Sequence, residues 1–481
     1  MKPALITFLM IFINFGITAQ DQPGTDEKVI TVAGGSFQNF LPLTAGLDDG
    51  NAYVSWFRSE PGGFKLYLQY LTESGIGAFG ENGMLVSGHT QPTSLSYYDL
   101  CAGKSGAVLV FTDIRGSGNL NVHAYKISPD GKNLWGPDGV TLSDDSNEYL
   151  FNPLIAKSDN EGYFVVWSVS SDNPRIEIKK VSSDGAKLSD GQKNVIKHSN
   201  EESLTAYSLI PSDSGAVIVV YGSSTGMFPN MKTTIHVQKI DKNGSLLWGE
   251  KGIIVHDEGK INISMTPSVI SDNKGGVIIS WYSAKYITRM QSVLVQKVTS
   301  DGRVIFEKGG ITVTDNADLN QFYPDAALNE RTGEIIIAWT GKNGAQSASS
   351  LLIQKISSDG QLLLGGTGYE ILPMSEHDIS APNLFIEDDG KEYNLKLVYS
   401  YRSEGKNNML MLQKTGPFTD GKNDAPDIAP AVRLSTPDAD VSRHAGFTDK
   451  TGTLRLFWES ESTGNRTIKG TALRADGSSG Y

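Results

Sequence analysis

Three phenylalanines and a set of arginines form the pattern in this sequence that is best suited to binding chemistry. An aromatic residue stands two positions before a proline at Phe40, Phe151 and Phe322. Aromatic faces can stack against a sugar ring, and guanidinium groups bind carboxylates and other anions through paired hydrogen bonds. The arginines follow the second β-type run of their repeat units, and Arg175 and Arg466 are also in this set. We expect ligand binding by Phe40, Arg58, Arg115, Phe151, Arg289, Phe322 and Arg402.

Acidic residues near these positions raise a second possibility, an enzyme that acts on carbohydrates. Glycoside hydrolases use two carboxyl groups, and related chemistry pairs a carboxylate with Tyr or His. The sequence does not show whether such groups converge, so no catalytic residue is assigned. A role without catalysis is favoured, and a glycoside hydrolase or polysaccharide lyase is the alternative. The carboxylate candidates are Asp113, Glu148, Asp315 and Asp318.

Metal-binding motifs are weak in this chain. The seven histidines are scattered singly, without the HxH, HxxxH or HExxH spacings of zinc sites. Segments 241–245 and 438–440 resemble parts of calcium loops, but they lack the alternating ligands and the distal Glu of such loops. We therefore expect no metal site and no cofactor, although structural calcium at a loop stays open.

The first twenty residues predict a signal peptide. Lys2 supplies a positive start, residues 4–17 form an apolar run of 14 residues, and residues 18–20 are small or polar. A bilayer-spanning helix needs about 20 apolar residues, so this run favours a cleaved peptide over an anchor. We expect a signal peptide at 1–20, a linker at 21–27, and an exported protein that is periplasmic or secreted.

Charge and cysteine content narrow the classes of partner. The formal net charge is −12, and it becomes −13 without Lys2. An acidic surface repels phosphate backbones, which argues against nucleic acid. No later segment approaches 18 consecutive apolar residues, so we expect no transmembrane segment in the mature chain. The single cysteine, Cys101, has no intramolecular partner, so stability must come from a large core.

A repeat that occurs eight times must position all of these residues. Each unit contains a β-type run that ends in an aromatic residue, and successive aromatics are 54 to 60 residues apart. One glycine-bearing turn precedes each run and another follows the next run, as expected for hairpins that need positive φ angles. The repeated aromatics are Trp56, Phe111, Trp167, Tyr221, Trp281, Trp339, Tyr399 and Trp458.

Units of this length and content predict an all-β fold, an eight-bladed β-propeller of four-stranded antiparallel blades. The second runs are apolar at nearly every position, which is typical of a strand buried on both faces. The third runs, such as HVQK and LIQK, alternate and predict a half-exposed strand. Leucine-rich solenoids repeat at about 20–29 residues, which is too short for these units. We expect one propeller domain over residues 28–481.

The two ends of the chain predict how the ring closes. The eighth unit contains three β-type runs and stops before a fourth. Residues 29–32 (VITV) form an unassigned run that matches the fourth runs of other units, such as 311–314. We therefore expect the N-terminal strand to complete the last blade, which removes the sheet edges that an open ring would expose.

The repeated phrase, VQK followed by DG, W-G and I-x-V, resembles the repeats of secreted bacterial β-propeller proteins. The resemblance covers nearly all of the chain after residue 20, but it concerns the fold and implies no catalytic residue. Segment 128–135 is also similar to the Asp-box of sialidase-type propellers. That motif places one residue between its Asp and Gly, whereas Asp130 and Gly131 are adjacent here.

Propeller geometry places the candidate residues on one face. The loops that enter the innermost strands and the loops that join second and third strands open on the same side of the ring, around the channel, and such pockets are the usual binding sites. We expect a monomeric interaction scaffold at the bacterial cell envelope, with a protein or glycan ligand on this channel face. Two alternatives stay open: the phenylalanines fill the blade ends while the arginines are solvated, or the protein is purely structural.

Overall fold

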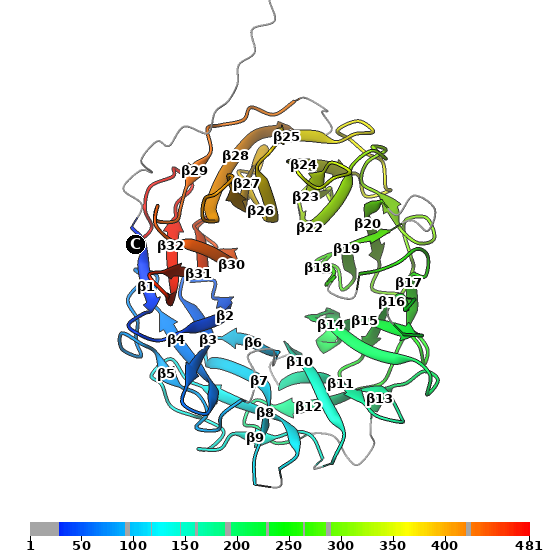
Figure 1. Cartoon of the computed structure of the whole chain (residues 1–481). Helices are drawn as coiled ribbons and strands as arrows, with labels where there is room; N and C mark the ends of the chain where they lie inside the picture. Colours follow the sequence, from blue (N-terminus) through cyan, green and yellow to red (C-terminus); the bar gives the residue numbers. More distant parts are fainter. Residues whose placement is uncertain are drawn as a thin grey trace, which may run out of the picture.

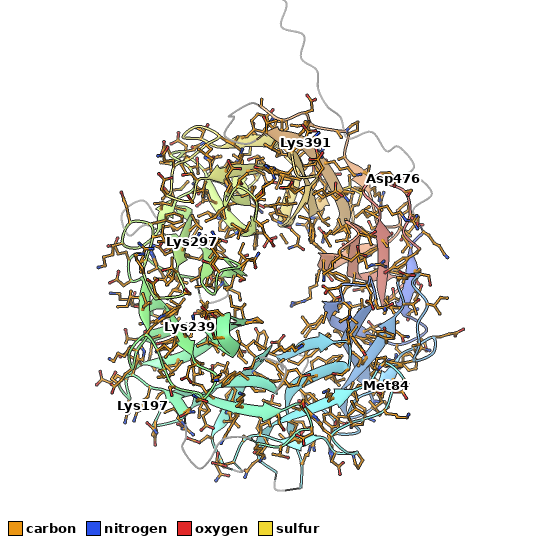
Figure 2. The ribbon with its side chains drawn as sticks, turned by 180° about the vertical axis from the view of Figure 1, so that it is seen from behind. Met84, Lys197, Lys239, Lys297, Lys391 and Asp476 are labelled. Atoms are coloured by element: carbon orange, nitrogen blue, oxygen red, sulfur yellow. The ribbon has the colours of Figure 1, made fainter. Side chains whose placement is uncertain are left out.

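The computed structural model describes residues 28–481 apart from 92–96, 117, 145, 159–161, 188–193, 228–229, 263–264, 285–289 and 420–424. The predicted signal peptide and linker, and Arg289, therefore lie outside the described residues. The described chain forms eight four-stranded antiparallel sheets arranged as a ring (Figure 1). With side chains drawn, the centre of the ring is still open (Figure 2). The predicted eight-bladed β-propeller is confirmed.

Each of the first four blades is a meander that runs from the innermost to the outermost strand. Blade 1 contains β2 (Asn39–Gly46), β3 (Ala52–Glu60), β4 (Gly63–Leu71) and β5 (Met84–Leu85). Blade 2 contains β6 (Tyr98–Gly103), β7 (Gly106–Ile114), β8 (Leu120–Ile127) and β9 (Val140–Thr141). Blade 3 contains β10 (Tyr149–Lys157), β11 (Gly162–Ser170), β12 (Arg175–Ser182) and β13 (Asn194–Ile196). Blade 4 contains β14 (Ser203–Pro211), β15 (Val217–Thr225), β16 (Lys232–Ile240) and β17 (Ile253–His256), with the short 3₁₀ turn η1 (Asp213–Gly215).

The last four blades follow the same order, except that blade 8 takes its outermost strand from the start of the chain. Blade 5 contains β18 (Ser268–Ser271), β19 (Val277–Ala284), β20 (Gln291–Val298) and β21 (Ile311–Thr312). Blade 6 contains β22 (Asn320–Leu328), β23 (Ile335–Lys342), β24 (Ser349–Ile356) and β25 (Tyr369–Ser375). Blade 7 contains β26 (Asp378–Asp388), β27 (Glu392–Arg402), β28 (Met409–Thr419) and β29 (Val432–Arg433). Blade 8 contains β30 (Asp440–Thr448), β31 (Leu454–Ser462), β32 (Asn465–Leu473) and β1 (Ile30–Ala33).

The second strands form the core between blades, as their apolar sequences predict. In β19 every residue is buried, and the indole of Trp281 is completely inaccessible. The glycine that begins the outermost segment of the same blade, Gly310, has a φ of +85° and lies against this ring. A Cβ at Gly310 would come within 2.7 Å of the indole. The glycine therefore serves both the turn and the close approach to the tryptophan.

The third strands fit the predicted half-exposed pattern in some blades and not in others. In β4 and β20 buried and partly exposed residues alternate in places, but β24 is buried at every position and β16 at all but two of nine. The glutamine of the repeated VQK is buried because it completes a turn: Gln354 donates to the carbonyl of Gly365 and accepts from the N–H of Leu364. Polar alternation here reflects internal hydrogen bonding, which a pattern of hydrophobicity alone does not separate from exposure.

The lysine of the same strands ties blades 2 and 4 to the blades that follow them. Lys126 donates to the Ser183 carbonyl at 2.9 Å, and Lys239 donates to the Ser300 carbonyl at 3.0 Å. Figure 2 labels Lys239 together with Lys297, the matching residue of the neighbouring blade. The aliphatic stem of each lysine is buried while its ammonium group reaches the adjacent turn, a common use of long cationic side chains.

The ring closes through the N-terminal strand, as the sequence predicts. Strand β1 pairs antiparallel with β32, with Ile30 opposite Gly470 and Thr31 opposite Lys469. Val32 and Ala33 are buried in the apolar cluster between blades 8 and 1. Residues more than 400 positions apart in the chain therefore complete one sheet, and all eight blades have four strands.

Candidate functional site

The channel face is formed where innermost strands begin and second strands end. The strand pairing shows this directly, since Asn39 of β2 lies opposite Arg58 of β3 and Asp378 of β26 lies opposite Arg402 of β27. We use the name channel face for the segments that lead into the innermost strands together with the turns between second and third strands. Every described residue that the sequence predicted for ligand binding lies on this face.

Phe40 and Arg58 lie close together on blade 1. Arg58 is 4% exposed, and its guanidinium lies over the rings of Phe37 and Tyr67, at 4.3 and 3.9 Å from their centroids. It donates to the Asn82 carbonyl at 2.9 Å. Phe40 is covered on one side by the guanidinium of Arg466 from blade 8, at 4.8 Å. Arg58 therefore acts mainly as a support that fixes the aromatic side chains around it.

Arg115 and Arg402 are neutralised by carboxylates of their own chain. The guanidinium of Arg115 makes two hydrogen bonds to Asp113, at 2.9 and 3.1 Å. Arg402 donates to Asp378 at 3.0 Å, and Lys342 shares that carboxylate at 2.7 Å. An arginine already held by a carboxylate has less capacity to bind an anionic ligand.

Phe151 and Phe322 each belong to an aromatic pair on the channel face. Tyr149 stacks on Phe151 with centroids 5.8 Å apart and an interplanar angle of 24°. Phe322 packs against Tyr282 and Tyr323, at 5.4 and 6.0 Å. In both pairs the predicted phenylalanine is half-buried and its tyrosine neighbour is exposed. The phenylalanines thus back the surface that the tyrosines present.

Four exposed aromatics on the channel face were missed by the sequence analysis. They lie in blades 1, 2, 3 and 6, each shortly before or near the start of an innermost strand. Among the described residues, they are the exposed large aromatic side chains of the chain, and the other exposed large apolar residues are aliphatic. For three of them the signal was available in the sequence, as aromatics within three positions of the predicted ones, whereas Tyr97 has no predicted aromatic near it. Their exposed fractions are 39% for Phe37, 66% for Tyr97, 62% for Tyr149 and 45% for Tyr323.

Tyr323 owes its position to a bulge in β22. Its φ is +53°, and the strand register shifts between Phe322 and Asp325. The same left-handed conformation occurs at the matching positions Leu41, Asn152, Ala381 and Arg443 of other blades. A bulge bends a strand and redirects side chains near a rim. The innermost strands therefore turn at the channel mouth in the same way around much of the ring.

The carboxylate candidates for catalysis do not form one site. Asp113 is fully buried and binds both Arg115 and, at 2.8 Å, His123. Glu148 makes two hydrogen bonds of 2.7 Å to Arg175, which lower the pKa of Glu148 to about 2. These two residues belong to blades 2 and 3, whereas Asp315 and Asp318 are exposed on blade 6, elsewhere on the ring (Figure 1). A carboxylate with so low a pKa is a poor general acid near neutral pH.

Buried histidines occupy blade 4. His236 is 4% exposed and stacks on Tyr221, with ring centroids 5.0 Å apart. Its ring also lies 4.9 Å from that of His198, which binds Glu202 at 2.9 Å. Burial, reinforced by His198, lowers the pKa of His236 to about 4. The cluster is packed among side chains and has the character of a polar core.

Acidification should destabilise the propeller, with His236 contributing on the order of 3 kcal/mol between pH 7 and pH 4. An unfolded histidine gains its proton near pH 6.5, whereas folded His236 stays neutral down to about pH 4. The unfolded state therefore binds protons first, and stability falls with pH across this window. Denaturant unfolding at pH 7 and pH 4 should show a smaller loss for His236→Gln than for the unsubstituted chain.

Asp99 provides the control for this pH effect. Burial raises the pKa of Asp99 to about 6, so its folded form binds a proton before its unfolded form. Protonation of Asp99 therefore favours folding as the pH falls, the opposite sign to His236. Asp99→Asn should enlarge the acid destabilisation. Equal losses of stability in all three chains would contradict both assignments.

Metal ligands and membrane helices are not found in the part of the chain that the structure describes. No group of three His, Cys, Asp or Glu side chains there could hold a metal ion. At one of the calcium-like segments, the Asp241 carboxylate accepts the N–H groups of Asn243 and Ser245, as expected in a tight turn. No described helix has the length and apolarity needed to cross a membrane.

Comparison with known proteins supports the fold alone. The sequence matches no protein-family model, and a search of curated proteins finds no relative. An ulvan lyase from a new family of polysaccharide lyases, solved bound to a GlcA(1-4)Rha3S repeat, aligns over 93% of this chain and 96% of its own, with 11% identity and a TM-score of 0.50. A protein of unknown function from Dyadobacter fermentans aligns over 69% of this chain and 96% of its own, with 10% identity and a TM-score of 0.38. At such identities the likeness concerns the propeller architecture alone.

Proposed function

We propose that this protein is an exported interaction scaffold of the cell envelope that binds a glycan on its channel face. The observation that carries the proposal is the set of exposed aromatics, Phe37, Tyr97, Tyr149 and Tyr323, around one side of the ring. Three of them, Phe37, Tyr97 and Tyr149, belong to three consecutive blades, and exposed aromatic rings on one face can stack against a sugar. Export is supported by the apolar segment at residues 4–17.

The aromatic surface is preorganised. The guanidinium of Arg58 packs against the ring of Phe37. Phe151 packs against Tyr149, and Phe322 packs against Tyr323. A side chain that is already held in its binding position loses little conformational entropy when a ligand arrives. The phenylalanines and Arg58 predicted from the sequence therefore serve as supports in this proposal, while the tyrosines make the contact.

The charges around this surface favour a ligand with many hydroxyl groups over a strongly acidic one. Arg115 and Arg402 are paired with Asp113 and Asp378, so neither offers a free guanidinium. Tyrosine hydroxyls and aromatic faces suit a sugar, whose ring stacks while its hydroxyls make hydrogen bonds. The ulvan lyase bound to a saccharide repeat shows that a propeller of this architecture can hold a glycan.

A glycan array tests the proposal. The chain should bind one or more neutral oligosaccharides, and a chain with Tyr97→Ala, Tyr149→Ala and Tyr323→Ala should bind them about 100-fold more weakly, since each stacked ring contributes about 1 kcal/mol. Ile76→Ala with Leu247→Ala is the matched control, because both residues are exposed apolar side chains in turns on the opposite face. The control should bind normally.

Two results would overturn the proposal. Unchanged glycan binding by the triple variant would remove the aromatic surface from the site. Appearance of new reducing ends or unsaturated sugars during incubation with the bound oligosaccharide would show catalysis, and the protein would then be an enzyme instead of a scaffold.

A further inference from the structure

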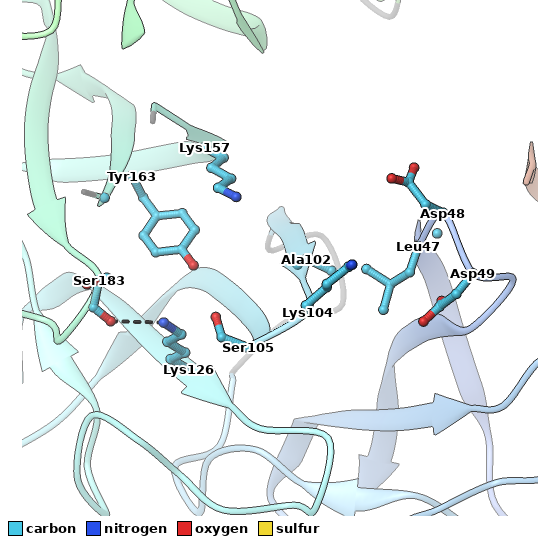
Figure 3. A pocket seen from close by; sticks show the side chains of 13 residues that line it. Leu47, Asp48, Asp49, Ala102, Lys104, Ser105, Lys126, Lys157, Tyr163 and Ser183 are labelled. Carbon is cyan, nitrogen blue, oxygen red and sulfur yellow. Dashed lines mark hydrogen bonds between the residues drawn. The ribbon is translucent and has the colours of Figure 1, made fainter. Parts of the chain in front are cut away.

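A cavity lies on the side of the ring opposite the channel face, between blades 1, 2 and 3. Its volume is about 500 Å³. The turns between first and second strands line it together with the end of β8 and the turn after β12. We call it the turn-face cavity. Figure 3 shows Lys126, Lys157 and Tyr163 on one side of it, with Asp48 and Asp49 on the other. A cavity of this size suits a molecule as large as one or two sugar units.

Three lysines line this cavity. Lys126 is 4% exposed, and its ammonium group donates to the Ser183 carbonyl at 2.9 Å. Lys104 and Lys157 are exposed at the rim. Among the described residues, which leave out the neighbouring segment 159–161, no carboxylate forms an ion pair with Lys126. A buried ammonium group is costly unless a negative partner accompanies it.

The two acidic residues among the described lining residues each have one partner and can accept further hydrogen bonds. Asp48 forms an ion pair with Lys450 of blade 8 at 2.6 Å. The Asp49 carboxylate accepts the N–H of Asn51 within its own turn. The walls of the cavity therefore combine a cationic side with a side that offers carboxylate acceptors. Burial and the positive charge of Lys157 lower the pKa of Lys126, and the Asp184 carboxylate offsets part of this effect.

Blade 4 contains the matching lysine together with a counter-ion. Lys239 occupies the position of Lys126 in the third strand, and it makes the same bond to the next blade, to the Ser300 carbonyl at 3.0 Å. Lys239 also forms an ion pair with Asp213, at 2.5 Å. At these turns Ala102 pairs with Ala107 and Pro211 pairs with Val217, and Lys104 and Asp213 each lie two positions after the paired residue of the innermost strand. Blade 2 therefore carries a positive charge where blade 4 carries the counter-ion of the buried lysine.

We propose that the turn-face cavity binds a small molecule through an oxyanion group, a carboxylate or a sulfate, which takes the place that Asp213 has beside Lys239. Lys126 provides the buried cation, and Lys104 and Lys157 provide charge at the rim. Ser105 and Tyr163 add hydroxyl groups to the lining. The acceptors at Asp48 and Asp49 suit sugar hydroxyls, so an acidic monosaccharide or disaccharide fits the cavity. A local group of three cations is notable in a chain whose formal net charge is −12.

The test uses thermal unfolding with three probes at constant ionic strength. Sodium glucuronate supplies a carboxylate on a sugar, sodium sulfate supplies the oxyanion alone, and glucose is the uncharged control. Constant ionic strength, held with sodium chloride, separates specific binding from screening. We expect a saturable rise in Tm with glucuronate or sulfate and none with glucose, because ligand binding to the folded state alone stabilises it. The stronger of the two anions identifies the preferred group.

Lys104→Asp is the decisive variant, since it recreates the Asp213–Lys239 pair of blade 4. It should raise the Tm without any anion and abolish the anion-dependent rise. Lys157→Gln should weaken binding about tenfold, and Lys391→Gln, which alters an exposed lysine in the corresponding turn of blade 7, should leave it unchanged.

Two outcomes would overturn the inference. The first is an equal anion response in Lys104→Asp and the unsubstituted chain. The second is an equal rise in Tm with glucose. The triple tyrosine variant of the channel face should keep the full anion response, so this inference and the proposed glycan site can fail separately.

Discussion

Trp281→Ala is expected to lower the free energy of unfolding by about 3–5 kcal/mol, the range for deleting a large aromatic side chain from a well-packed core. The indole of Trp281 is completely buried between blades, among Val293, Val295 and Trp339 of the largest apolar cluster. Strand β20 pairs with β19 along its whole length, which limits how far the sheet can collapse into the space. Denaturant unfolding followed by circular dichroism measures the change.

Trp248→Ala is the matched control. Trp248 occupies the second tryptophan position of the repeat, after the turn between third and fourth strands, and it is only partly buried. Its truncation should cost about half as much or less, because less apolar area returns to water. Equal losses at the two positions would contradict the view that the second strand carries the core of each blade.

The fold was predictable because the same constraint, an apolar strand that must be buried on both faces, occurs in all eight units. A strand such as β19, apolar at nearly every residue, must be buried on both faces, and only stacked sheets provide two such faces. The third strand was harder to predict, since Gln354 and Lys355 look like exposed residues in the sequence. Both are buried, because the glutamine completes a turn and the lysine reaches Glu334 at 3.5 Å.

The channel-face site was only partly predictable. The sequence indicated which loops share a face, and it drew attention to Phe40, Phe151 and Phe322 through the prolines that follow them. It did not show that the exposed aromatics are their neighbours Phe37, Tyr149 and Tyr323, because exposure depends on the bulge of each innermost strand and on the adjacent blade. Ion pairs also escaped prediction when they joined separate segments: Arg402 and Asp378 are 24 positions apart, and only the pairing of β26 with β27 brings them together.

The turn-face cavity shows a different limit of prediction from the sequence. Every part of it is present in the repeat: a lysine at the end of the third strand, a turn between first and second strands, and a carbonyl from the next blade. Its character arises from a difference between blades 2 and 4, Lys104 in place of Asp213 near the buried lysine. Blade 8 also has a lysine at this turn position, Lys450, but Ala472 replaces the buried lysine there. A repeat is therefore informative both where its units agree, which indicates the fold, and where they differ, which indicates a site.

Val32→Asp is expected to open the ring and to lower the free energy of unfolding by at least about 3 kcal/mol, since it places an unpaired charge in an apolar cluster. Val32 is 1% exposed and packs with Trp56, Phe457 and Ile468 at the junction of blades 8 and 1. Loss of β1 would leave the hydrogen-bonding edge of β32 unpaired, and such edges promote association. Guanidinium unfolding measures the stability, and light scattering measures the association.

Ring opening should also disturb the channel face, because the junction of blades 8 and 1 supports part of the aromatic surface. Glu459 of blade 8 accepts the N–H of Leu41 of blade 1 at 2.7 Å, and Arg466 of blade 8 covers Phe40. Val32→Asp should therefore weaken glycan binding as well as stability. Thr31→Asp is the control, since Thr31 lies in the same strand with its side chain exposed, and it should change neither property by more than about 0.5 kcal/mol. A fully stable, monomeric Val32→Asp chain would show that the eight blades hold together without the N-terminal strand, and that closure contributes little to either the fold or the site.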